Sequence, residues 1–169
     1  MKQILFATTR SSAPLFLRLL LGIVLFPHGA QKLLGWFGGF AFEGSMGYFT
    51  GTVGLPWIVG FLVILVEFFG PLFLILGFAT RFWSLAIFFV MSGIVVTSMH
   101  DYFFMNWFGN QKSEGMEFFL LTIGMSLSLL VSGSGRWAVD RLLQRRADAA
   151  RLGGARFPVP EFSAQELRA

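Results

Sequence analysis

The segment FPHGAQK, residues 26–32, places an imidazole, an amide and an ammonium group at the end of a long apolar run. His28 and Lys32 are four residues apart, so they share one face of a helix. Glu67 stands near the middle of a second apolar run. An ionisable group at the centre of a membrane helix costs about 2.5–3.5 kcal/mol on insertion scales, so such groups usually face the bundle interior and pair there.

The depths of these groups indicate one cluster in the outer half of a membrane bundle. A rise of ~1.5 Å per residue places Glu67 about 15 Å and His28 about 9 Å below the outer boundary. The vertical gap of about 6 Å is within reach, directly or through one water. We therefore predict Glu67 and His28 as a catalytic pair. The predicted cofactor-binding residues around them are Gln31, Lys32, His100 and Glu117.

Such a cluster could serve several kinds of chemistry. A quinone headgroup needs hydrogen bonds at two oxygens and a path for protons, and His28 with Glu67 suits that task. A polar network that fixes helix packing is the structural alternative. A metal site from His28, His100 and a carboxylate is disfavoured, because the scattered spacing matches no ligand motif. A transport pathway is disfavoured because the four apolar runs show no inverted repeat.

Composition indicates an integral membrane protein. Of the 169 residues 55% are hydrophobic, 22 are Phe and only 13% are charged, with a mean hydropathy of +0.69. A soluble domain of this size could not bury so much apolar surface. The chain has no cysteine, which excludes disulfides, thiolate metal sites and iron–sulfur clusters within it. The glycine-rich stretch does not read as a nucleotide fingerprint, so we expect no nucleotide and no nucleic-acid partner.

Hydropathy predicts four spans, at residues 14–34, 57–78, 82–100 and 115–133. Each has about 19 to 22 residues, enough to cover a hydrocarbon core of ~30 Å. The short link ATR makes the second and third spans an antiparallel hairpin. We predict an all-α fold: an integral membrane four-helix bundle over residues 1–140, followed by a basic cytoplasmic tail over residues 141–169.

The connections on the predicted outer side, residues 35–56 and 101–114, are rich in glycine and aromatic residues. We predict interfacial aromatic loops, which either anchor the bundle or cover a site. After Gly135 the sequence predicts a basic, amphipathic helix that anionic lipid headgroups attract. Gly133 and Gly135 are expected to end the fourth helix, and Arg136 to meet its carbonyls and pair with Asp140.

The basic residues predict the orientation. Lys2, Arg10, Arg18, Arg81 and the arginines from Arg136 onward fall on one side of the predicted bundle. The positive-inside rule therefore places both termini and the ATR turn in the cytoplasm.

The ordered motifs resemble the DoxX family of small four-span bacterial membrane proteins. The matching pieces are RLLLGIVLFPHGAQKLLGWFGG, GLPWIVGFLVILVEFFGPLFLILGFATR, a late His in the third span, EGMEFFLL and GSGRWAVD. The family pattern falls on His28, Gly29 and Lys32, on Glu67, on Thr80 and Arg81, on Glu117, and on Gly133, Gly135, Arg136 and Asp140.

The resemblance implies a location in the bacterial inner membrane and a quinone-linked role. The family takes its name from a subunit of a thiosulfate:quinone oxidoreductase, and other members are linked to oxidative stress or to quinone resistance. We therefore expect a membrane component of a redox or quinone-detoxification system, with the lipid bilayer and membrane or soluble redox subunits as partners, and a homo-oligomer as a further option. The alternative is a non-catalytic membrane scaffold that assembles or anchors partner proteins.

Overall fold

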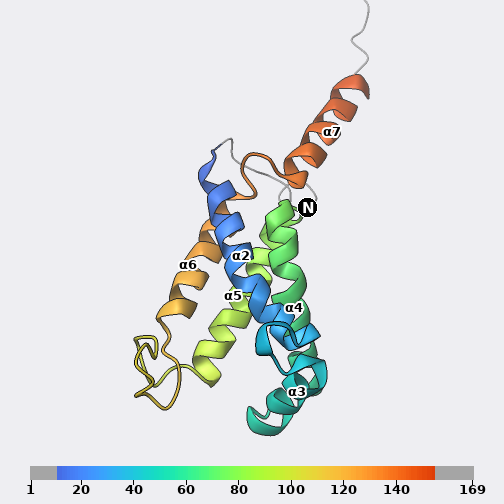
Figure 1. Ribbon diagram of the computed structural model, residues 1–169. Helices are drawn as coiled ribbons and strands as arrows, with labels where there is room; N and C mark the ends of the chain where they lie inside the picture. The colour runs from blue at the N-terminus through green and yellow to red at the C-terminus, as the bar shows by residue number, and fades with distance from the viewer. Residues whose placement is uncertain (1–10, 155–169) are drawn as a thin grey trace, which may run out of the picture.

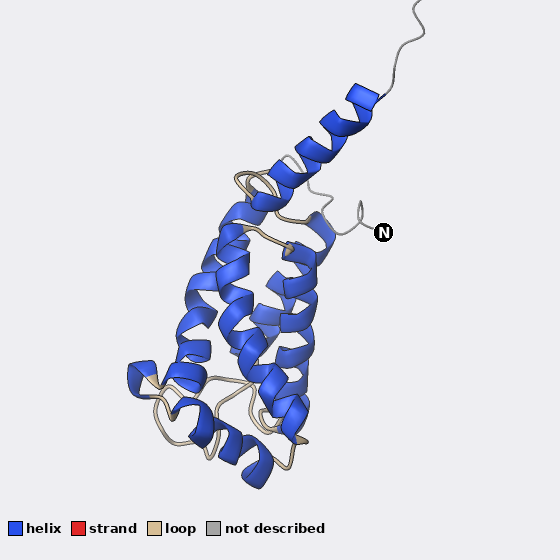
Figure 2. Ribbon diagram, turned by 90° about the vertical axis from the view of Figure 1, so that its right-hand side faces the viewer, coloured by secondary structure: helices blue, strands red, loops and turns tan. Residues whose placement is uncertain are grey.

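The computed structural model describes residues 11–154, which form helices and connections without a strand (Figures 1 and 2). Four helices lie side by side as a bundle: α2 (Ala13–Leu34), α4 (Trp57–Leu76), α5 (Thr80–Thr97) and α6 (Glu117–Ser132). A further helix, α7 (Val139–Gly154), projects from one end of the bundle. The predicted all-α membrane bundle is confirmed. Lys2, Arg10 and the tail from residue 155 lie outside the described residues.

Among the described helices, α2, α4 and α5 are long and apolar enough to cross a membrane. The helix of the fourth predicted span, α6, is apolar but has 16 residues, about 24 Å at 1.5 Å per residue. It is shorter than predicted because residues 115 and 116 belong to the connection before it. Large apolar side chains such as Phe16, Leu20 and Phe89 remain exposed on the outside of the bundle, as a lipid-facing surface requires.

The bundle is organised as two helix pairs, because α2 packs most extensively on α4 and α5 on α6. The pairs meet in a buried apolar core that all four helices supply: Leu21, Leu25, Leu74, Ile87, Met91 and Leu129. We refer below to the two ends of the bundle as the α7 end and the α3 end, after the helices that mark them in Figure 1.

The connection between α2 and α4, predicted as an interfacial aromatic segment, contains helical turns. It contains a 3₁₀ turn at Trp36–Gly38, a short helix α3 (Ala41–Gly47) and a π-helical turn at Tyr48–Thr52. Met46 and Phe49 are buried against Ile64 of α4. This packing orders a glycine-rich segment that would have little helical preference alone.

The connection between α5 and α6 forms no regular helix and is held by two carboxylates instead. Glu114 accepts a hydrogen bond from the backbone N–H of Asn106 at 3.0 Å, and Glu117 accepts one from Met105 at 3.4 Å. A side chain at Gly115 would collide with the carbonyl oxygen of Phe104, 2.0 Å from its Cβ position. The chain therefore folds closely around the start of α6.

At the α7 end, the buried Arg18 joins three segments of the chain. Its guanidinium donates hydrogen bonds to the carbonyl oxygens of Leu74 and Ile75, at the end of α4. It also donates to the carbonyl oxygens of Arg136 and Trp137, which precede α7. Only 1% of Arg18 is exposed, so these carbonyls replace the water that the cation would otherwise need.

Asp140 fixes α7 to the start of α5. Its carboxylate accepts hydrogen bonds from the backbone N–H groups of Ala79 at 2.6 Å and Thr80 at 3.0 Å, and its own N–H donates to the carbonyl of Gly77. The predicted pairing of Asp140 with Arg136 was wrong, because the carboxylate binds the amide groups at the start of α5 instead. The role expected of Arg136 belongs to Arg81, which donates to the carbonyl of Val131 near the end of α6.

We expect Asp140→Ala to destabilise the protein by about 1–3 kcal/mol, because it leaves the part-buried N–H of Ala79 and the buried N–H of Thr80 without an acceptor at the start of α5. Thermal unfolding of the purified protein in one detergent measures this loss. Asp148→Ala is the matched control, since Asp148 is an exposed acid of the same helix. Equal melting temperatures for the two variants would contradict the capping role.

Candidate functional site

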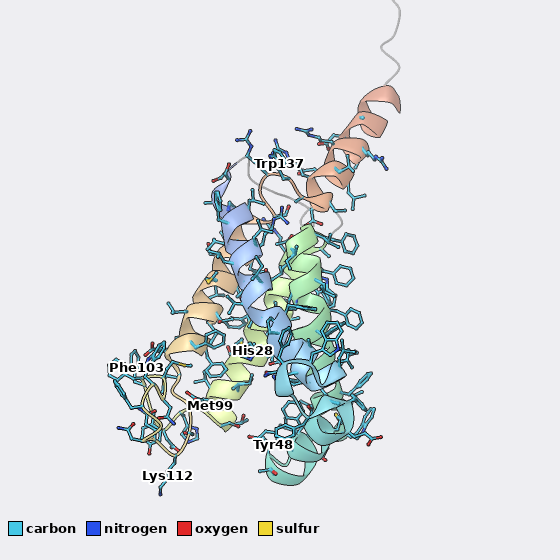
Figure 3. The ribbon with its side chains drawn as sticks, viewed as in Figure 1. His28, Tyr48, Met99, Phe103, Lys112 and Trp137 are labelled. Carbon is cyan, nitrogen blue, oxygen red and sulfur yellow. The ribbon has the colours of Figure 1, made fainter. Side chains whose placement is uncertain are left out.

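A cavity of about 530 Å³ opens in the half of the bundle nearer the α3 end. All four bundle helices and both connections contribute to its wall. Most of the lining is apolar, and its polar side chains include His28, Lys32, Glu67 and Glu114. Figure 3 shows His28 inside the bundle, with Tyr48 and Met99 closer to the α3 end; both also line the cavity.

Gly29 sets the distance between α2 and α4 at this cavity. A Cβ atom on Gly29 would lie 2.1 Å from the carbonyl oxygen of Glu67, so the backbones of the two helices touch here. Gly22, two turns earlier on the same face, meets the carbonyl oxygen of Pro71 in the same way, 2.9 Å from its Cβ position. Since only glycine permits this approach, the sequence brings the face that carries His28 and Lys32 directly onto the turn of Glu67.

Glu67 forms an ion pair with Lys32. The distance between Lys32 Nζ and Glu67 Oε2 is 2.7 Å, and the exposed fractions of the side chains are 27% and 3%. Sequence reasoning expected His28 as the best-placed partner of Glu67, directly or through one water. Lys32 takes that place because its four-carbon stem can carry the ammonium along the helix surface to a carboxylate deeper in the bundle. Among the described residues, Oε2 has no hydrogen-bond partner of normal geometry beside this ion pair.

His28 lies on the wall of the same cavity, one helical turn before Lys32. Its ring centre is 5.8 Å from that of Phe118 on α6. The side chain remains accessible, because the cavity that it borders is open. An accessible imidazole, an ammonium and a buried carboxylate therefore share one apolar space. Together they can donate hydrogen bonds, accept them and exchange protons with a bound molecule.

The other predicted residues have local roles outside the cavity lining. His100 is exposed and lies beside Asp101, with 3.4 Å between Nε2 and Oδ1. Gln31 donates to the carbonyl of Phe37 and so holds the 3₁₀ turn after α2. Glu117 accepts the backbone hydrogen bond from Met105 described above. His28 and His100 are thus not brought together, and residues 11–154 contain no group of three His, Asp or Glu side chains placed to hold a metal.

Two contributors to the site were not predicted from the sequence. Glu114 lines the cavity, although its carboxylate is already bonded to the backbone of Asn106. Tyr48 and Phe49, together with Val53 and Leu55, bring the first connection into the cavity wall. Sequence reasoning left open whether that connection anchors or covers a site, and it forms part of the wall. The unusual aromatic content of this segment was the available signal.

Comparison with known proteins identifies the family of this chain. The sequence model of the DoxX family matches residues 13–101, which include α2, α4, α5 and the Lys32–Glu67 pair. The chain belongs to the DoxX family. It is similar to the Bacillus subtilis (strain 168) protein named "Putative oxidoreductase CatD", with 30% identity over 126 residues, 75% of this chain and 83% of that protein. No solved structure matches the chain.

We expect Gly29→Ala to destabilise this DoxX protein by about 2 kcal/mol or more, because the new methyl group would force α2 away from α4. Gly124→Ala is the matched control, since Gly124 lies in α6 with open space around its Cβ position. That control should be neutral or up to about 1 kcal/mol more stable. Thermal unfolding in detergent measures both, and an unaffected Gly29→Ala protein would contradict the close approach.

Proposed function

We propose that this DoxX protein is the membrane component of a redox or quinone-detoxification system, and that its cavity takes a quinone headgroup. The observation that carries the proposal is the Lys32–Glu67 ion pair in an otherwise apolar cavity that His28 also lines. A quinone has a flat, apolar ring with oxygens at opposite edges. Such a ligand needs an apolar space with few, well-placed polar groups, as small-molecule sites generally offer.

Each polar group has a distinct task in this proposal. His28 and Lys32 donate hydrogen bonds to a quinone oxygen. Glu67, which lines the cavity, holds or passes a proton at that oxygen. Reduction of a quinone to a quinol takes up two electrons and two protons. The electrons are supplied by a reductant or a redox partner subunit, and the protons move through Glu67 and His28.

The surroundings of the cavity suit a ligand that arrives through the membrane. Leu62 and Phe89 line the cavity and are also 51% and 63% exposed on the outside of the bundle. The wall is therefore partly formed by lipid-facing residues. A lipid-soluble molecule could enter sideways here without crossing water. The similarity to a protein named as an oxidoreductase supports a redox role in the same direction.

Quinone binding by variants tests the proposal. We expect Glu67→Gln and His28→Gln to bind a short-chain benzoquinone at least about tenfold more weakly, a loss of about 1.4 kcal/mol. The double variant should lose little more, because residues that act as a unit are not additive. Binding is measured by calorimetry on purified protein in detergent. The matched controls Glu43→Gln and His100→Gln, which lie outside the cavity lining, should bind within about twofold of the parent protein.

A further variant separates this function from a purely structural ion pair. Lys32→Met/Glu67→Leu removes both charges together, so neither partner is left buried and unpaired. If the pair only fixes helix packing, this protein should be stable and should bind quinone like the parent. That result would contradict the role of Lys32 and Glu67 in quinone binding, whereas a parent protein that binds no quinone would favour the non-catalytic scaffold. A stable protein without quinone binding supports the proposal.

We further propose that the protein lies in the bacterial inner membrane with the α7 end in the cytoplasm. Support comes from the arginines gathered at that end: Arg81, Arg136 and those of α7. Because the chain has no cysteine, single cysteines report topology cleanly. An impermeant maleimide should label exposed Lys112→Cys in intact spheroplasts, and exposed Ala147→Cys only after permeabilisation. The reverse labelling pattern would overturn this orientation.

A further inference from the structure

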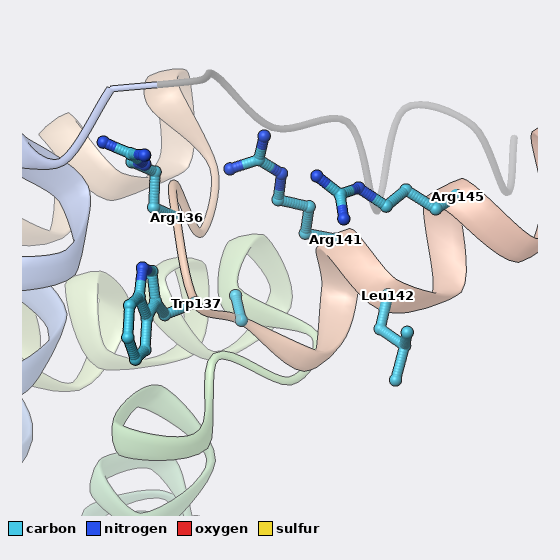
Figure 4. Close-up of a pocket in the computed structure, with 6 residues that line it drawn as sticks. Arg136, Trp137, Arg141, Leu142 and Arg145 are labelled. Atoms are coloured by element: carbon cyan, nitrogen blue, oxygen red, sulfur yellow. The ribbon is translucent and has the colours of Figure 1, made fainter.

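A second hollow, of about 310 Å³, lies at the α7 end, far from the cavity described above. Residues just before α7 and its first turns line it: Arg136, Trp137, Ala138, Arg141, Leu142 and Arg145. We call this hollow the basic pocket, and Figure 4 shows that its basic and its apolar side chains point to opposite sides. Arg136, Arg141 and Arg145 extend to one side of the chain, whereas Trp137 and Leu142 point to the other. The pocket thus offers guanidinium groups above and apolar side chains below.

The backbone of the basic pocket is held in place by the bundle. Trp137 has a φ of 56°, a left-handed conformation that a bulky residue adopts only when its surroundings enforce it. Arg18 enforces it here by donating to the carbonyls of Trp137 and Arg136. Asp140, beside Arg141 in sequence, is bonded to the start of α5. The arginines therefore stand on an ordered backbone.

The charges of the basic pocket are not compensated within the described part of the chain. No ion pair or hydrogen bond engages the side chains of Arg136, Arg141 or Arg145 among residues 11–154. The acid nearest to Arg136 and Arg141 in sequence, Asp140, is 1% exposed and already accepts two backbone hydrogen bonds. The acid nearest to Arg145, Asp148, is exposed and forms no ion pair with it. The three guanidinium groups around this pocket repel one another unless a bound anion neutralises their charge. Phosphate suits them best, because guanidinium binds its oxygens in pairs.

The position of the pocket indicates whether it binds a soluble phosphate or the phosphate of a lipid headgroup. The carbonyls that Arg18 bonds belong both to this segment and to the end of α4, so the pocket lies level with the ends of the membrane helices. Trp137 is 83% exposed and Leu142 51% exposed, which suits the boundary between headgroups and acyl chains. In Figure 1 α7 then leads away from the bundle, so its first turns stay closest to this boundary.

We propose that the basic pocket is a binding site for the phosphodiester headgroup of an anionic glycerophospholipid. The three arginines hold the phosphate, and Trp137 and Leu142 contact the glycerol and upper acyl chain. A zwitterionic phosphatidylcholine binds less well, because its trimethylammonium group approaches the same arginines. This site goes beyond the proposed quinone function and does not depend on it. It also differs from diffuse attraction, in which every arginine of α7 would count equally.

The test compares two double variants that each remove two positive charges. Arg141→Gln/Arg145→Gln changes the pocket, and Arg146→Gln/Arg151→Gln removes two arginines further along α7. The full-length proteins, in a neutral detergent, are titrated with phosphatidylglycerol or phosphatidylcholine, and bound lipid is counted by native mass spectrometry. We expect the pocket variant to lose affinity for phosphatidylglycerol about tenfold or more, and the control to stay within about twofold.

Each other outcome is decisive. Equal losses in both double variants would indicate diffuse attraction and overturn the site, as would an unchanged pocket variant. Displacement of phosphatidylglycerol by millimolar inorganic phosphate would assign the pocket to a soluble anion and overturn the lipid proposal. Arg141→Lys/Arg145→Lys keeps the charge and loses the paired hydrogen bonds, so it should bind with intermediate affinity. This variant keeps the test valid if the glutamine variant fails to fold, because a lysine variant with full affinity overturns guanidinium recognition.

Discussion

The contact between the backbones of α2 and α4 at Gly29 is the constraint on which the candidate site depends. With a carbonyl oxygen of α4 where a Cβ atom would stand, the two helices cannot be separated by side chains. Glu67 is consequently enclosed to 3% exposure, and Lys32, one turn beyond Gly29 on α2, is the cation within reach. A buried ion pair is seldom a net source of stability, because both charges lose hydration. Its place on a cavity wall therefore favours a role in binding over a role in folding.

The two ends of the bundle use different means to order the chain. At the α7 end, Arg18, Arg81 and Asp140 form hydrogen bonds to some of the backbone groups that the ends of α4, α5 and α6 leave unpaired. At the α3 end, apolar packing of Met46 and Phe49 and hydrogen bonds from the backbone to two glutamates order the connections. The first arrangement is tight and polar. The second leaves a cavity between the connections and the helices, as the lining from both connections shows.

Hydropathy predicted the helices well, because span length and apolar content follow directly from bilayer thickness. The aromatic content of residues 35–56 predicted a segment at the membrane interface, but not the helical turns that packing against Ile64 orders there. In a similar way, His100 was expected to end the third helix inside the cluster. The helix ends at Thr97 instead, so His100 lies in the connection and outside the cavity wall.

The cluster itself was predicted in part for a simple geometric reason. Rise per residue gives the depth of a side chain, and helical spacing gives the face that two residues share. Both arguments correctly placed His28, Lys32 and Glu67 in one cluster, since all three line the same cavity. Neither gives the rotation of one helix against another or the reach of a flexible side chain. For that reason the expected partner of Glu67 was His28, whereas the structure places the ammonium of Lys32 there.

Arg18 and Glu67 show how the same bundle treats two buried charges differently. Arg18, 1% exposed, meets four carbonyl oxygens through its two terminal nitrogens, although its Nε has no partner among the described residues. Glu67, 3% exposed, meets one ammonium. The terminal nitrogens of Arg18 are occupied by backbone carbonyls, so this buried cation stabilises the fold. Glu67, whose ion-pair partner is Lys32, lies beside the cavity instead, and for this reason Glu67 rather than Arg18 is the candidate for contact with a bound molecule.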